Sequence, residues 1–98
     1  MTIQKNSEGA TLNLAIEGRL DTTTAPELEA VVKDSLEGIG ELYVDFSKLE
    51  YISSAGLRVL LSMQKQMTKQ GKMVVKNVGS EIMEILDVTG FSDILTIE

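Results

Sequence analysis

Two adjacent serines, Ser53 and Ser54, lie between an apolar, strand-like stretch ending at Ile52 and an apolar, helix-like stretch beginning near Leu57. A serine at the start of a helix can accept a hydrogen bond from a free backbone amide, which stabilises the helix by about 1 kcal/mol. A strand that leads into a helix also directs unsatisfied amides outward, and such a place tolerates a phosphate. The serines are therefore a helix cap, a site of reversible phosphorylation, or both.

Histidine and cysteine are both absent from the 98 residues, which excludes several kinds of catalysis. Without histidine there is no Ser–His–Asp triad, no two-histidine metal site and no ordinary general base near neutral pH. Without cysteine there are no disulfides and no thiolate zinc sites. The glycines of residues 38–43 (GIGELY) and 79–84 (GSEIME) lack the lysine that a P-loop requires. We therefore expect a protein that is not an enzyme and that binds no cofactor and no metal.

Pairs of carboxylates would be the remaining route to metal or glycoside chemistry. The chain offers Glu27 with Glu29, and Asp45 with Glu50. Because pairs of this kind are common on acidic surfaces, we interpret them as solvated side chains.

The chain carries a net charge of −6, with 9 Lys and Arg against 15 Asp and Glu. This balance opposes binding to nucleic acids and to anionic membranes, which both depend on Lys and Arg. It is neutral toward protein partners, or favourable when the partner has a basic patch. The expected partners are therefore proteins, without nucleic acid and without a membrane.

The length and composition predict one globular domain spanning residues 1–98. The hydrophobic fraction of 43% and the charged fraction of 24% are close to the averages for globular proteins. There is no apolar run of the roughly 18–20 residues that a membrane span needs, and the N-terminal MTIQKNSEGA has no signal-peptide core. We expect a cytoplasmic protein.

The N-terminal third predicts a hairpin followed by a helix. Apolar and polar residues alternate over residues 12–16, after a short strand that begins at Ile3, and residues 6–9 (NSEG) suit the turn between the strands. Thr24 and Glu27 have the spacing of a capping box, with Pro26 in the first helical turn. These residues predict two antiparallel strands and a helix that ends at the glycines of residues 38–40.

The rest of the chain alternates strands and helices. The pattern predicts a strand over 41–46, a helix over 55–69, a strand over 73–76, a helix capped by Ser80 and ended by Gly90, and a strand over 93–98. This alternation favours parallel strands with right-handed crossovers, and the opening hairpin makes the sheet mixed. The predicted fold class is α/β, with a mixed, largely parallel β-sheet, helices packed against it and the order ββαβαβαβ.

The chain resembles the STAS domain family, named for sulfate transporters and anti-sigma factor antagonists, and within it the stand-alone bacterial anti-anti-sigma factors. The resemblance covers nearly the whole chain. The matching residues are Gly18–Asp21, Thr24 with Ala25, Tyr43–Phe46 with Leu49, Tyr51–Leu57, Gly71 with Met73–Val75, and Leu86 with Thr89–Phe91.

The resemblance implies a switch operated by phosphorylation. The unphosphorylated protein would bind an anti-sigma factor that is itself a serine kinase, and the sigma factor would be released. The kinase, which binds ATP and Mg²⁺, would then phosphorylate Ser54 and end the binding, and a serine phosphatase would reset the protein. The family often has an acidic residue before the acceptor serine and a second hydroxyl after it. Here Ser53 and Ala55 occupy those positions, so Ser53 is a competing acceptor.

We expect the partner to contact the start of the second helix and the loop before the first. The candidate partner-binding residues are Asp21, Thr22, Thr23, Ser53, Ser54, Ala55, Gly56 and Arg58, although Asp21–Thr23 are equally suited to ordinary capping. The alternative is a STAS-type interaction module in a scaffold or a lipid-transport assembly, without a phosphoswitch. In either case we expect a monomer or a weak dimer. The sequence does not identify the sigma factor, the kinase or the phosphatase.

Overall fold

The computed structural model describes residues 1–98 and contains a six-stranded sheet with three α-helices. The elements are β1 (Thr2–Glu8), β2 (Thr11–Leu20), α1 (Ala25–Ser35), β3 (Glu41–Asp45), β4 (Leu49–Ile52), α2 (Ser54–Gln70), β5 (Lys72–Lys76), α3 (Ser80–Val88), the 3₁₀ turn η1 (Phe91–Asp93) and β6 (Thr96–Ile97). None of the helices has both the length and the apolar character that crossing a membrane requires.

The sheet has the order β1-β2-β3-β5-β6, and β1 is the one antiparallel strand. The ten-residue β2 is its centre, because its first half pairs with β3 and its last residues, Gly18–Leu20, pair with β4. This confirms the predicted mixed, largely parallel sheet. The predicted order lacked one element: the strand-like stretch ending at Ile52 is a strand of its own, β4. A tight turn, in which the Leu49 amide donates to the Phe46 carbonyl at 3.0 Å, separates it from β3.

Two predicted boundaries near the chain ends were wrong. The hairpin turn lies at Gly9 and Ala10 rather than at residues 6–9, because Gly9 has the positive φ (59°) that a two-residue hairpin turn requires. The predicted strand over 93–98 is reduced to β6. The amides of Asp93, Ile94 and Leu95 donate to carbonyls of Gly90 and Phe91, so these residues turn instead of pairing with β5.

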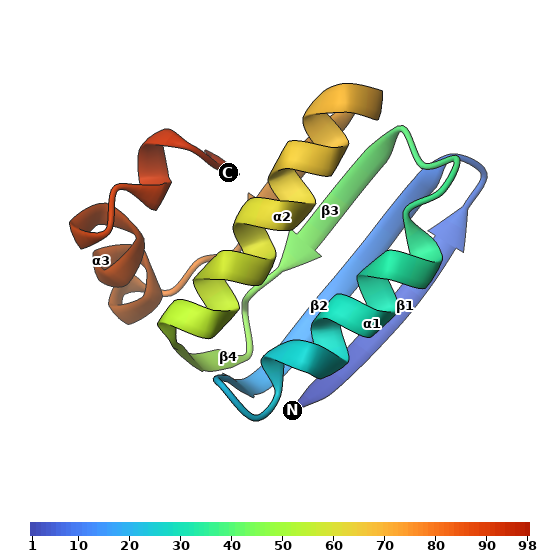
Figure 1. The fold of residues 1–98 in the computed structure, drawn as a ribbon. Coiled ribbons are helices and arrows are strands. Elements are labelled where there is room, and N and C mark those ends of the chain that lie inside the picture. Colours follow the sequence, from blue (N-terminus) through green and yellow to red (C-terminus); the bar gives the residue numbers. More distant parts are fainter.

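Helices α1 and α2 lie side by side on one face of the sheet, with α1 over β1 and β2, and α3 lies beside β4 (Figure 1). The core between helices and sheet contains no buried polar or charged residue. The alternating residues Leu12, Leu14 and Ile16 of β2 are all at most 1% exposed. On α2, Met63 and Met67 face this core, and each is also at most 1% exposed. The alternation of apolar and polar residues over 12–16 therefore predicted the buried face of β2 correctly.

Candidate functional site

The start of α2 is held against the ends of β2 and β4. The Ser53 amide donates to the Leu20 carbonyl at 2.9 Å, which joins the helix start to the last residue of β2. Gly56 is buried, and a Cβ atom there would lie 2.7 Å from the Leu20 Cγ and 3.0 Å from the Ile52 Cγ1. Only a glycine lets the first turn of α2 approach the two strands this closely.

The two serines have different places in the helix. Ser53 is the N-cap, with an extended backbone (φ −98°, ψ 175°), and its Oγ accepts the Gly56 amide at 3.3 Å. Ser54 is the first residue of α2; its side chain is exposed and takes part in none of the hydrogen bonds of the structure. The helix cap predicted for one of the two serines therefore belongs to Ser53, and the Ser54 hydroxyl has no structural partner.

The loop between β2 and α1 is organised by Asp21. Its Oδ1 accepts the amides of Thr23 at 3.0 Å and Thr24 at 3.1 Å. These amides, with that of Thr24 contributing most, hold the pKa of the Asp21 carboxyl below its ordinary value. The predicted capping box of Thr24 and Glu27 was wrong. Thr24 already has helical dihedral angles, and its hydroxyl accepts the Asp21 amide and donates to the Arg19 carbonyl, each at 2.8 Å.

A hollow of about 300 Å³ lies between α1 and α2 at this end of the molecule. Of the candidate residues, Thr22, Ala55 and Arg58 meet there; the other lining residues are Ala25, Pro26, Glu29, Val59 and Ser62. Thr23 is exposed on the same loop as Thr22, whereas Gly56 is buried and acts through its small size. The candidate surface thus combines the β2–α1 loop with the first turns of α2.

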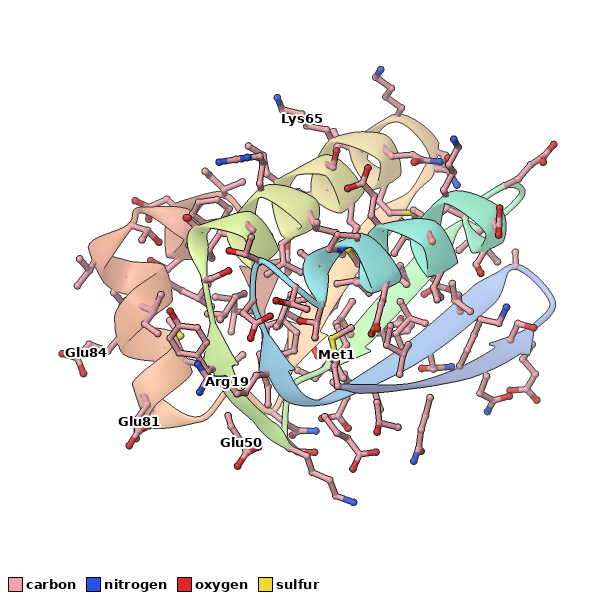
Figure 2. All side chains as sticks on the ribbon, turned by 60° about the horizontal axis from the view of Figure 1, so that its bottom comes forward. Met1, Arg19, Glu50, Lys65, Glu81 and Glu84 are labelled. Carbon is pink, nitrogen blue, oxygen red and sulfur yellow. The ribbon has the colours of Figure 1, made fainter.

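Sequence reasoning missed a pair of residues on the strands beside this site. Arg19 on β2 and Tyr51 on β4 are neighbours across the sheet, and the guanidinium carbon lies 4.3 Å from the centre of the tyrosine ring. Arg19 also lies 3.7 Å from an Asp21 carboxylate oxygen. Figure 2 labels Arg19 at the surface of the molecule. Recognising β4 as a strand parallel to β2 would have been the signal that places the two side chains together.

The arrangement holds no concentration of metal-binding side chains. No three His, Cys, Asp or Glu residues lie close enough together to bind a metal ion. What the site offers is an exposed hydroxyl at a helix start, a polar loop and two arginines, Arg19 and Arg58. These groups can make protein contacts, and the hydroxyl can accept a modifying group.

The STAS domain model matches residues 2–98, and the chain belongs to this family. A relative in Bordetella bronchiseptica, BtrV, is named as a candidate anti-sigma factor antagonist; it is 32% identical over 84 residues, which cover 84% of this chain and 72% of BtrV. The anti-sigma-B factor antagonist of Staphylococcus aureus is 25% identical over 97 residues, covering 97% of this chain and 90% of that protein.

The fold is also similar to that of SpoIIAA, an anti-sigma factor antagonist whose structure is known in two chemical forms. The unphosphorylated form has a TM-score of 0.77, at 14% identity, covering 99% of this chain and 87% of SpoIIAA. The phosphorylated form, from Bacillus, has a TM-score of 0.76, also at 14% identity, covering 99% of this chain and 91% of that one. Both forms share the fold described above.

Proposed function

We propose that this protein is an anti-sigma factor antagonist that phosphorylation of Ser54 switches off. The observation that carries the proposal is the division of roles at the start of α2. Ser53 holds the helix cap, so the exposed Ser54 hydroxyl is free for modification. The names of the two sequence relatives support the role of antagonist. In this role the protein is a cytoplasmic binding partner and a kinase substrate, and the catalytic machinery, ATP and Mg²⁺ belong to the kinase.

A phosphate at Ser54 is compatible with the fold. Phosphorylation adds about −1.5 to −2 charges at neutral pH. The N-terminal dipole of α2 offsets this charge by roughly 0.3–1 kcal/mol, and the first turn of the helix contains no acidic residue. No side chain depends on the Ser54 hydroxyl, so its modification breaks no hydrogen bond.

A partner packed against Ser54 responds differently to the same phosphate. Leaving an unpaired charge buried in an interface costs roughly 3–5 kcal/mol. This energy corresponds to a loss of about two to four orders of magnitude in affinity. Thr22, Ala55 and Arg58, which line the hollow beside Ser54, would contact the unphosphorylated partner. The switch thus acts at the interface, with the fold unchanged, and a phosphatase restores binding.

The proposal is tested by phosphopeptide mapping after incubation of the protein with ATP and an extract of its native host. We expect phosphate on residues 51–58 that disappears in Ser54→Ala and persists in Ser53→Ala. Loss of the phosphate only in Ser53→Ala would move the acceptor to the neighbouring position. An unmodified segment, in an extract whose serine kinases are demonstrably active, would contradict the proposal and favour a STAS interaction module of a scaffold or lipid-transport assembly.

A further inference from the structure

Helix α2 carries an excess of positive charge in an otherwise acidic protein. Residues 53–80 contain five Lys and Arg residues and no Asp or Glu, whereas the whole chain has a net charge of −6. Arg58, Lys65 and Lys69 lie on α2, and each is exposed. None of the three is within ion-pair distance of a carboxylate, since the three ion pairs of the structure involve other cations.

These cations share one side of the helix with Ser54. At 3.6 residues per turn, Ser54, Arg58, Lys65 and Lys69 fall within about 60° of the helix circumference. The side that they share faces away from the buried Met63, and Figure 2 shows Lys65 pointing away from the body of the molecule. The row is about 22 Å long, at a rise of about 1.5 Å per residue. We call these four residues the α2 strip.

We propose that the α2 strip is a docking surface for an acidic face of the anti-sigma factor. The inference rests on the proposed function and adds the chemistry of the partner's surface. A row of unpaired cations attracts a surface of opposite charge and speeds its approach. Duplex nucleic acid is a weaker match, because three cations neutralise few phosphates and the rest of the chain repels them. The net charge of the chain left the charge of a protein partner open or favoured a basic patch, whereas the distribution of charge on α2 favours an acidic one.

This surface explains why a phosphate at Ser54 is an effective off signal. Ser54 is the first residue of the strip, and Arg58 lies one turn further on the same side of α2. A phosphate there has the same sign as the partner's acidic face and repels it. It also attracts the Arg58 guanidinium, which removes one cation from the partner. One modification thus adds a repulsion and weakens an attraction.

The test compares two double variants that change the net charge of the protein equally. Lys65→Glu with Lys69→Glu reverses the far part of the strip, and Lys5→Glu with Lys48→Glu reverses two exposed lysines outside it, on β1 and in the β3–β4 turn. The probe is the purified host anti-sigma factor that phosphorylates Ser54. Association rates are measured by stopped flow across a range of NaCl concentrations. We expect the strip variant to associate about tenfold more slowly at low salt, with the difference shrinking as salt is added.

The Ser54→Asp variant separates failure of this inference from failure of the proposed function. If Ser54→Asp weakens binding but the strip variant associates as fast as the unmodified protein, the acidic docking face is wrong and the phosphoswitch stands. If the control variant slows association as much as the strip variant, only overall charge matters and the inference also fails. If neither the unmodified protein nor Ser54→Asp binds, the proposed function and this inference fail together. Strip-dependent binding to duplex DNA without an effect on the anti-sigma factor would equally overturn it.

Discussion

Ser53 and Ser54 are adjacent in the chain, but their side chains have different surroundings. The Ser53 Oγ accepts the Gly56 amide, and the Ser54 side chain is exposed without a hydrogen-bond partner. We expect Ser53→Ala to lower the free energy of unfolding by about 1 kcal/mol through loss of the cap. Ser54→Ala should change it by no more than about 0.5 kcal/mol, as for other exposed positions. Urea denaturation of the two variants measures both effects, and an equal loss in both would contradict this division of roles.

Gly56 carries a second prediction at this scale. An added methyl group would lie 2.7 Å from the Leu20 Cγ and 3.0 Å from the Leu20 carbonyl oxygen. Gly56→Ala should therefore lower the free energy of unfolding by about 1–3 kcal/mol, the usual cost of overpacking, and shift the start of α2 away from β2. Gly40→Ala is the matched control, because its Cβ would meet no atom within 4 Å. Thermal unfolding of both variants tests this expectation, and equal stability of the two would disprove it.

At the residue scale, the sequence could predict that the two serines matter without distinguishing their roles. Either serine has the hydroxyl that a cap needs, and the choice depends on whether the helix starts at residue 54 or one position later. That start is fixed by the Ser53 amide bonding to Leu20, a contact between residues 33 positions apart. Local pattern does not contain this information.

The loop between β2 and α1 should lose stability at low pH. Backbone amides, above all that of Thr24, lower the pKa of Asp21 in the folded protein. The unfolded state therefore binds a proton at a higher pH than the folded state does. The stabilisation by Asp21 is present above the ordinary carboxyl pKa of about 4 and is lost as the pH falls further, through the pKa of the folded protein.

We accordingly expect the difference in unfolding free energy between the unmodified protein and Asp21→Asn to shrink as the pH falls below about 4. Urea denaturation at several pH values between 7 and 3 measures this difference. Asp34→Asn on α1 is the control, since the Asp34 carboxylate accepts none of the hydrogen bonds of the structure. A difference for Asp21→Asn that stays constant over the whole range would show that the ionised carboxylate does not stabilise this loop.

The far ends of α1 and α2 are joined by one side chain. The Gln70 Nε2 donates to the Leu36 carbonyl at 2.6 Å and to the Ile39 carbonyl at 2.7 Å. Gln70→Ala should cost about 1 kcal/mol of stability and speed hydrogen exchange in the α1–β3 connection. Gln66→Ala is the control, because Gln66 is exposed one turn earlier and makes no such bond. Unchanged exchange in Gln70→Ala would disprove the bridging role.

At the element scale, the sequence predicted the long elements better than the short ones. The apolar faces of α1, α2 and β2 repeat over several turns or pairs, so their burial follows from periodicity alone. The four residues of β4 and the two of β6 are too short to show a period. Their pairing depends on β2 and β5, which lie beside them only in the folded chain. Thr24 likewise matched the capping-box pattern, but the Asp21 carboxylate accepts the Thr24 amide that the Glu27 side chain would have bonded.

At the scale of the whole molecule, total charge described the surface poorly. A value of −6 says nothing about the row of cations on α2, because the acids are placed elsewhere, as on α3 with Glu81, Glu84 and Asp87. Each helix exposes only one face to solvent. The charge that a partner contacts is therefore set by the residues on that exposed face, and not by the net charge of the whole chain.

Phosphorylation should leave this molecule's architecture intact. The Ser54 side chain makes no hydrogen bond. We therefore expect its phosphorylation to change amide chemical shifts mainly in the first turns of α2 and in the β2–α1 loop. The turn of the β1–β2 hairpin at Gly9 and Ala10 lies at the opposite end of β2 from Leu20, which bonds to Ser53, and it should keep its shifts. Two-dimensional NMR of the protein with and without phosphate on Ser54 tests this, and widespread changes across the sheet would indicate a conformational switch instead.

The lack of a hydrogen bond at the Ser54 hydroxyl has a consequence for how long a phosphorylation state of such a protein would persist. Because the Ser54 hydroxyl holds no hydrogen bond, neither the phosphorylated nor the unphosphorylated form would gain from a rearrangement of the fold, and the protein itself would not drive the conversion of one form into the other. The phosphorylated state would persist in the covalent bond to phosphate until a phosphatase hydrolyses it. The proportion of the two forms in a cell would then report the recent balance of two opposing catalysts, independently of how stable the protein itself happens to be.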